Sequence, residues 1–164
     1  MQLTQSRRNN KDILVIDEAM ITYRNFSGAP SQFNREGDRN FALIIPNMDI
    51  ADALIKAGWN VKVKPPREEG DDPFITLAVK IKFSDFGPNV YLRVGENGRR
   101  LKLDEESISR LDAINIIPGS IGMDIRAYDW EMPNGNKGRT AYLDAMEVVQ
   151  DVDRFSARYE EDEF

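Results

Sequence analysis

Apolar and cationic residues alternate along four short segments in the middle of the chain, and this alternation constrains the fold more than any other feature. The segments are "WNVKVK" (59–64), "FITLAVKIKF" (74–83), "NVYLRV" (89–94) and "RRLKL" (99–103). Successive side chains of a β-strand point to opposite faces of the sheet, so a period of two residues indicates strands. The sequence therefore predicts a sheet that buries one face and exposes the other.

Most of the remaining chain is also predicted to be β. Strands are expected over 12–26, 39–46, 120–132 and 138–151, and short helices over 47–58 and 104–114, the second capped by Asp104. Many short strands with few helices favour a small closed or nearly closed β-barrel. The expected architecture is mainly β, an OB-fold-like barrel, which normally carries a helix between its strands.

The chain is expected to hold one domain with two extensions. The domain covers residues 12–151, between a polar N-terminal arm (1–11) and a disordered acidic C-terminal tail (152–164). Residues 1–103 carry 16 Lys/Arg and 13 Asp/Glu, a net charge of +3, whereas residues 104–164 carry 6 and 15, a net charge of −9. The two parts are therefore expected to play opposite electrostatic roles.

The composition argues against several classes of function. The chain has no cysteine and no histidine, which removes thiol nucleophiles, Ser–His triads and histidine or thiolate metal sites. It contains neither of the glycine-rich phosphate-binding motifs GxGxxG and GxxxxGK(S/T). The acidic stretch "REEGDDP" (67–73) has the composition of a solvated loop rather than of a magnesium site. We therefore expect a protein that is not an enzyme and has no cofactor or metal. No apolar run is long enough to span a membrane.

The exposed face of the alternating strands is predicted to carry one sign of charge. Seven cations and no acid occupy its positions, together with one tyrosine, although the whole chain has a net charge of −6. Cations neutralise phosphates and aromatic faces stack on bases, which is what a single-stranded nucleic-acid groove requires. The predicted groove residues are Lys62, Lys64, Lys80, Lys82, Tyr91, Arg93, Arg100 and Lys102.

A polar loop (27–38) adds aromatic and arginine residues to this prediction. The tripeptide "RNF" flanks the loop on both sides, at 24–26 and 39–41. Arginine pairs with phosphate and also stacks on bases, so interleaved arginines and aromatics are typical of such grooves. The candidates here are Tyr23, Arg24, Phe33, Arg35 and Arg39, and Trp59 and Trp130 are further candidates for base stacking.

The chain ends in four consecutive carboxylates, Glu160, Glu161, Asp162 and Glu163, followed by Phe164. The carboxylates are expected to compete with DNA for the basic groove, most strongly at low salt. The phenyl ring of Phe164 and its carboxylate are expected to dock into an apolar pocket of a partner protein.

Several stretches of the chain resemble a family of bacteriophage single-stranded DNA (ssDNA)-binding proteins. They are "ITYRNFSG", "FNREGDRNFALII", "ALIKAGWNVKVKPPREEGDDP", "LDEESISRLD" and "AYDWEM", and the resemblance runs in order over about residues 12–155. The resemblance implies an OB-fold barrel that binds ssDNA without sequence preference during phage replication and recombination. It also implies the cytoplasm of an infected bacterium as the location. The ending "YEEDEF" is similar to the acidic, Phe-terminated tails of many replicative ssDNA-binding proteins. This similarity implies replication or recombination proteins as the partners of the tail.

Two alternatives remain open at the level of sequence. One is an acidic phage interaction protein, such as a DNA mimic that inhibits a host factor and binds no DNA. The other is a magnesium-dependent nuclease built from the acidic clusters. The sequence also allows either a monomer or a homodimer.

Overall fold

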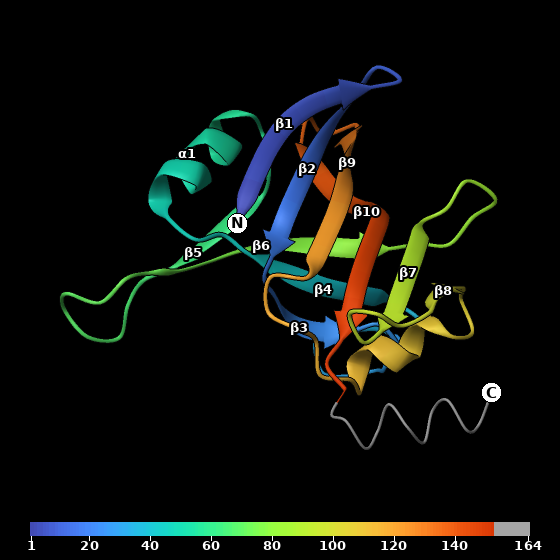
Figure 1. Ribbon diagram of the computed structural model, residues 1–164. Helices are drawn as coiled ribbons and strands as arrows, with labels where there is room; N and C mark the ends of the chain where they lie inside the picture. The colour runs from blue at the N-terminus through green and yellow to red at the C-terminus, as the bar shows by residue number, and fades with distance from the viewer. Residues whose placement is uncertain (153–164) are drawn as a thin grey trace.

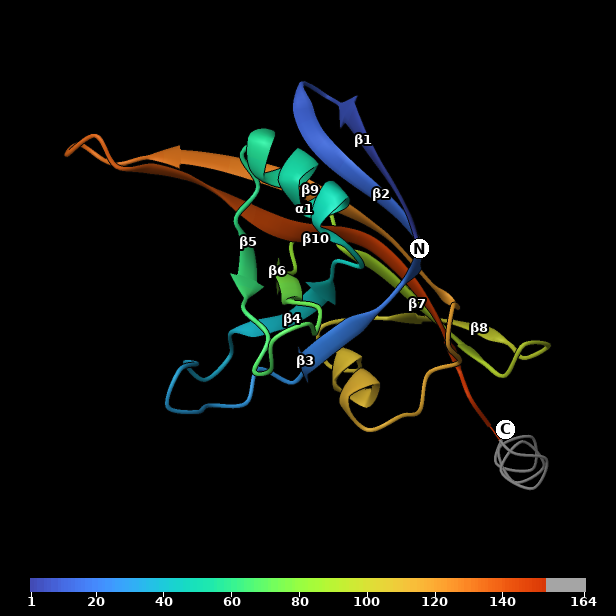
Figure 2. The same cartoon turned by 90° about the vertical axis from the view of Figure 1, so that its left-hand side faces the viewer.

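The computed structural model describes residues 1–152, which form one ten-stranded sheet with one α-helix and one 3₁₀ helix. Figures 1 and 2 show the arrangement. The elements are β1 (Gln2–Arg8), β2 (Lys11–Ala19), β3 (Ile21–Asn25), β4 (Arg39–Ile44), α1 (Met48–Lys56), β5 (Val61–Lys64), β6 (Phe74–Ile81), β7 (Asn89–Val94), β8 (Arg100–Leu103), η1 (Ile108–Asp112), β9 (Ile121–Glu131) and β10 (Lys137–Gln150).

Strand β10 joins the two halves of the sheet. It pairs with β9 in antiparallel fashion along most of its length, with β6 in parallel at Ala141 and Tyr142, and with β7 in parallel from Ala145 to Gln150. The register of the β9–β10 pairing shifts between Leu143 and Ala145. At the same place the partner on the other edge of β10 changes from β6 to β7. In Figure 1, β4 and β6 cross behind β2, β9 and β10 at a steep angle, which is the orthogonal packing of a folded-over sheet.

The hydrophobic core lies between these crossing layers. Phe26 and Phe41 stack with ring centroids 5.4 Å apart, and Leu14, Ile16 and Leu77 are almost completely buried beside them. The mainly β, OB-like architecture is confirmed. The pairing path runs β1-β2-β9-β10-β6-β4-β3, and its two ends do not pair, so hydrogen bonds among the described strands do not close the barrel.

The N-terminal segment, predicted to be a polar arm, is an edge strand of the sheet. All seven residues of β1 pair with β2, from Gln2 opposite Asp17 to Arg8 opposite Lys11. Six of the seven are exposed, because β1 lies at the end of the pairing path. A polar sequence suits an exposed edge strand, since charges there discourage pairing with other chains. A polar N-terminal segment is therefore compatible with a paired edge strand.

The single strand expected over 12–26 is divided into β2 and β3 around Met20. Glu18 and Tyr23 have positive φ angles of 53° and 52°, and the register of each strand shifts near them. These irregularities bend the chain so that β2 pairs with β9 while β3 pairs with β4.

The first predicted helix is confirmed and the second is shorter than predicted. The Asn47 side chain accepts a hydrogen bond from the Ile50 backbone N–H at 2.9 Å and caps α1. In the second segment, Asp104 accepts bonds from the N–H groups of Glu106 and Ser107, but helical residues begin only at Ile108. The Ser107 hydroxyl, which also donates to Asp104, lowers the pKa of that carboxyl group.

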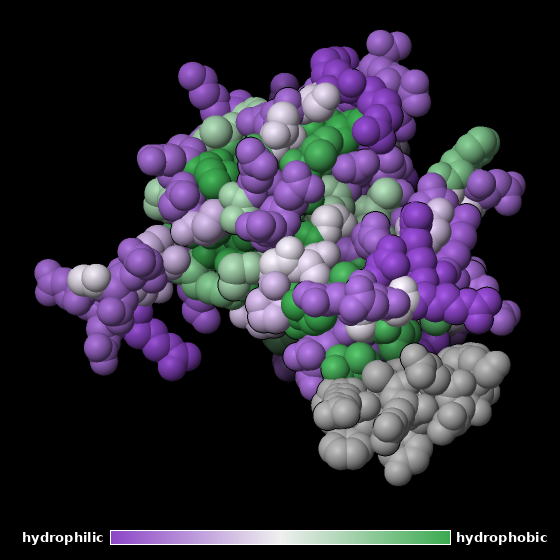
Figure 3. Space-filling model, viewed as in Figure 1, coloured by the Kyte–Doolittle hydropathy of each residue, from purple (hydrophilic) through white to green (hydrophobic). Residues whose placement is uncertain are grey.

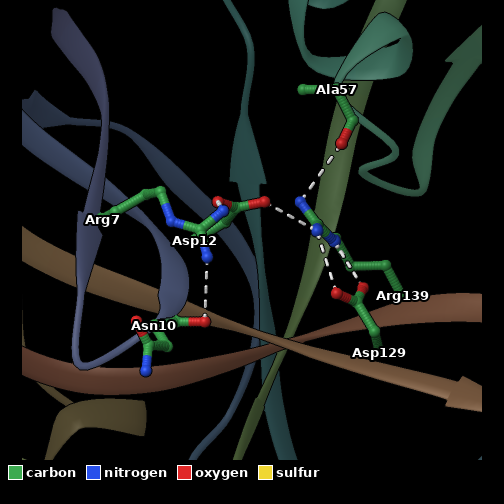
Figure 4. Close-up of polar contacts among 6 residues, drawn as sticks. All are labelled: Arg7, Asn10, Asp12, Ala57, Asp129 and Arg139. Carbon is green, nitrogen blue, oxygen red and sulfur yellow. Dashed lines mark hydrogen bonds and ion pairs between the residues drawn. The ribbon is translucent and has the colours of Figure 1, made fainter.

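Arg139 fastens α1 to the sheet (Figure 4). Its guanidinium donates to Asp129 at 2.7 Å and 3.0 Å, to Asp12 at 2.8 Å and to the Ala57 carbonyl at 3.1 Å. It also lies 5.0 Å from the centroid of the Trp59 ring. Hydrogen bonding from Arg139 lowers the pKa of Asp129. These contacts fix the β9–β10 hairpin relative to α1 and β2.

No helix among residues 1–152 has the length and apolar character needed to cross a membrane.

Candidate nucleic-acid interface

Strand β6 supplies the centre of the candidate interface. Its buried residues Ile75, Leu77, Val79 and Ile81 alternate with outward residues that include Lys80, as the sequence predicts. Lys80 is opposite Asn40 of β4 on one side and opposite Tyr142 of β10 on the other. Residues opposite each other in neighbouring strands share a face, so these three side chains are neighbours on the outer surface.

Strand β5 extends this outer face with two more lysines. Lys62 and Lys64 are opposite Thr76 and Phe74 of β6, and both lysines are exposed. Tyr23, which is 67% exposed, approaches Phe74 edge-on with ring centroids 6.2 Å apart. Tyr23 also has a left-handed backbone conformation, with a φ of 52°. Cations and aromatic rings are thus interleaved along β5 and β6.

Strands β9 and β10 continue the same face with aromatic residues. Tyr142 has the Arg126 guanidinium 4.9 Å from its ring centroid and Tyr128 edge-on at 6.1 Å. Trp130 donates a hydrogen bond to the Thr140 hydroxyl at 3.2 Å and covers Gly138, where an added Cβ would lie 2.5 Å from the indole. The Gly138 position therefore needs glycine if Trp130 is to lie flat on the hairpin.

Two hollows meet on this face at Lys82, and together we call them the basic groove. The first, of about 640 Å³, is lined by residues that include Phe33, Lys80, Lys82 and Tyr142. The second, of about 550 Å³, is lined by residues that include Lys82, Arg126, Lys11 and Phe86. In Figure 2 the β3–β4 loop and the β9–β10 hairpin both project to the left, on either side of β5.

Four lysines of the outer face are available to bind an anion, and two of them, Lys80 and Lys82, line the basic groove. Within residues 1–152, Lys62, Lys64, Lys80 and Lys82 form neither an ion pair nor a side-chain hydrogen bond. The groove is not uniformly positive, because Asp38, Glu105 and Asp144 also line it. Arg8 pairs with Asp124 at 3.5 Å and Asp144 at 3.8 Å.

The loop between β3 and β4 presents Phe33 and Arg35 on a braced backbone. The Asn34 amide donates to the carbonyls of Ala29, Arg35 and Asp38 at 2.9 to 3.1 Å. Gly28 has a φ of 70°, and an added Cβ would lie 2.9 Å from the Gly37 carbonyl carbon, so the two arms of the loop touch. Phe33 lies in this hydrogen-bonded loop, and its side chain is 92% exposed.

Two arginines that were predicted to bind ssDNA, Arg24 and Arg39, form contacts within the protein instead. Arg24 donates to the carbonyls of Leu111 and Ile114 at 2.8 and 2.9 Å, which fixes η1 against β3. It lines a different hollow, outside the basic groove. Arg39 lines the groove but pairs with Glu105 at 3.5 Å, and only 19% of its side chain is exposed. We therefore place Arg24 outside the interface and Arg39 at its wall.

The remaining predicted cations form a separate group on β7 and β8. The Arg100 guanidinium lies 3.6 Å from the centroid of the Tyr91 ring and covers it. Arg93 donates to the Gly98 carbonyl at 3.0 Å and pairs with Glu147 at 3.7 Å. Lys102 is exposed opposite Tyr91. These strands reach the rest of the sheet through β10, and their cations do not line the basic groove.

The two tryptophans differ in what they can contact. Trp59 is 3% exposed, so it cannot stack on a base, and its prediction as a stacking residue is wrong. It follows the end of α1 and packs in the core. Trp130 is 38% exposed on the interface side of β9 and stays a stacking candidate. The tail residues Glu160 to Phe164 lie outside the described residues.

The groove also contains residues outside the predicted set, among them Arg126 and Phe86. Arg126 starts a period-two series with Tyr128 and Trp130 in "RAYDW", so the same alternation would have found it. Phe86 lies in the turn "SDFG", where no sequence pattern gives its position relative to β10. No group of His, Cys, Asp or Glu within residues 1–152 has the arrangement of a metal site.

Comparison with known proteins now gives the family. Residues 3–163 match the family model described as "Putative phage ssDNA-binding domain". The chain belongs to this family. No curated protein matches the chain.

Solved structures of the same architecture come from phage proteins. The ssDNA-binding protein of bacteriophage Enc34 in complex with ssDNA has a TM-score of 0.52 at 14% identity, covering 94% of this chain and 98% of that one. Its C-terminally truncated form has a TM-score of 0.50 at 14% identity, covering 93% and 97%. At this identity the likeness concerns the fold.

Proposed function

We propose that this member of the phage ssDNA-binding family binds ssDNA in the basic groove without sequence preference and coats it during phage DNA replication or recombination. The observation that carries the proposal is the row of exposed lysines on the outer face. Lys80 lies beside Tyr142 in the groove together with Lys82, and Lys62 and Lys64 extend the row along β5. Lysines without protein partners can neutralise phosphates along a strand, and exposed rings can stack on any base.

The proposal extends to the surroundings of the protein. The acidic tail modulates DNA binding and recruits replication or recombination proteins, and the protein acts without enzymatic activity in the cytoplasm of the infected bacterium. What supports this part is the family and the composition of "YEEDEF". A homodimer and a monomer are both compatible with the proposal.

Fluorescence anisotropy with a labelled oligothymidine and a duplex of the same length tests the proposal. We expect much tighter binding of the single strand at low salt and affinity that falls steeply as salt rises. Equal or absent binding of the two would contradict the proposal and favour an acidic interaction protein. Incubating the labelled strand with Mg²⁺ is the matching control, because cleavage would reveal a nuclease.

A further inference from the structure

Two turns of the molecule repeat one pattern of sequence and hydrogen bonds. "SQFN" (31–34) and "SDFG" (84–87) each begin with serine and carry phenylalanine at the third position. In each turn the first and fourth residues exchange two backbone hydrogen bonds, at 2.9 and 3.2 Å in one and 2.8 and 3.2 Å in the other. The serine hydroxyl accepts the N–H of the phenylalanine at 3.3 Å in both.

Each turn holds its phenyl ring almost entirely in solvent. Phe33 is 92% exposed and Phe86 is 94% exposed, the two highest values among the large apolar residues of the described chain. Figure 3 shows apolar atoms at the tip of the β6–β7 loop, standing clear of the polar surface around it. Neither ring stabilises the core, so the hydrogen-bonded turns present apolar surface for a ligand to cover.

The two rings lie at the two hollows of the basic groove. Phe33 lines the hollow with Lys80 and Tyr142, and Phe86 lines the hollow with Arg126. Lys82 lines both hollows and follows β6 directly, between the two turns in the groove. A strand that crosses from one phenyl ring to the other therefore passes the cations of the groove on the way.

We propose that Phe33 and Phe86 are paired base-stacking platforms that receive bases at the two ends of the ssDNA path. A phenyl ring has no hydrogen-bonding group, so each platform accepts any base. The strand must be long enough to reach both rings, which gives the site a minimum length. This inference rests on the proposed function, because it assumes that ssDNA lies in the basic groove.

The test compares Phe33→Leu, Phe86→Leu and the double variant with the full-length protein. Leucine keeps apolar bulk but removes the ring. Oligothymidines of about 4 to 16 nucleotides, the range of site sizes of OB domains, serve as ligands, alongside strands of the same length with abasic units. Ile55→Ala is the matched control, because Ile55 is 46% exposed on α1 and lines neither hollow.

Each leucine variant should weaken binding of the longer oligothymidines about five- to a hundredfold, and the double variant should lose more affinity. Tryptophan in place of either phenylalanine keeps an aromatic ring, so Phe33→Trp and Phe86→Trp should bind about as tightly as the wild type. Abasic strands have no base to stack, so the leucine variants should bind them about as tightly as the wild type does. The shortest oligothymidines reach only one of the two rings, so the double variant should lose no more affinity for them than the more affected single variant. Leucine variants that bind every strand as tightly as the wild type would overturn the inference while leaving the proposed function intact. A wild type that binds no ssDNA would overturn both.

Discussion

At the scale of single residues, the contacts of a cation decide its role. Arg24 and Arg93 both donate to backbone carbonyls, and Arg100 covers Tyr91, so their charges have partners within the protein. Lys80 and Lys82 form no such contact within residues 1–152. A phosphate gains most from cations that do not have to give up a partner first.

The first prediction compares two pairs of cations with the same total charge. Lys80→Gln with Lys82→Gln should reduce the slope of log affinity against log salt by about 1.4, because each phosphate contact to a single strand contributes about 0.7. Arg100→Gln with Lys102→Gln is the control and should leave the slope nearly unchanged. Salt titrations by anisotropy measure both slopes. A larger effect of the control pair would place the DNA on β7 and β8.

At the scale of elements, the β9–β10 hairpin depends on Arg139 for its position. Arg139 is 11% exposed and binds two carboxylates at once, whereas the Asp129 side chain is 65% exposed. The pKa of Asp129 is lowered by hydrogen bonding from Arg139, so the folded protein favours its charged form. Stabilisation from this pair is therefore present above the unfolded pKa of about 3.9 and is lost as pH falls through the lower folded value.

The second prediction tests this pH dependence. Asp129→Asn should lower the free energy of unfolding by about 0.5–1 kcal/mol at pH 7, a size discounted for the exposure of the carboxylate. The difference from wild type should shrink as pH falls below about 4, because the wild-type carboxylate then becomes neutral too. Urea unfolding followed by circular dichroism at several pH values measures it. Glu131→Gln, on the same hairpin, is the control and should show no such trend.

Local pattern predicted the elements well where burial follows strand period. The faces of β6 and β7 came from alternation alone, because β6 buries every second residue and β7 buries Val90 and Leu92. The roles of Arg24 and Trp59 could not be predicted in this way. Their partners, Leu111 and Arg139, are about 90 and 80 residues away along the chain, and only the crossing of the sheet brings them together. The polar edge strand β1 shows the same limit, since its pairing depends on β2.

At the scale of the whole molecule, charge is divided between the basic groove and the acidic C-terminal residues. Residues 154–164 lie beyond the described part of the chain. Removing 154–164 should tighten ssDNA binding at low salt, and the gain should fade near 0.5 M salt because screening shortens electrostatic range. Phe164→Ala should leave DNA binding unchanged and weaken recruitment of replication proteins. Equal affinity of the truncated and full chains at low salt would contradict tail competition.

The long strand β10 also has a consequence for synthesis of the protein on the ribosome. Every other described strand precedes β10, yet β10 alone joins β6 and β7 to β9. Until it has been translated, β1-β2-β9, β3-β4-β6-β5 and β7-β8 can form only as separate pieces that share no ladder. Nascent chains therefore cannot join these pieces into one sheet until β10 has been synthesised. Tyr142 belongs to β10, so a chain that has not reached β10 also lacks the central ring of its own groove.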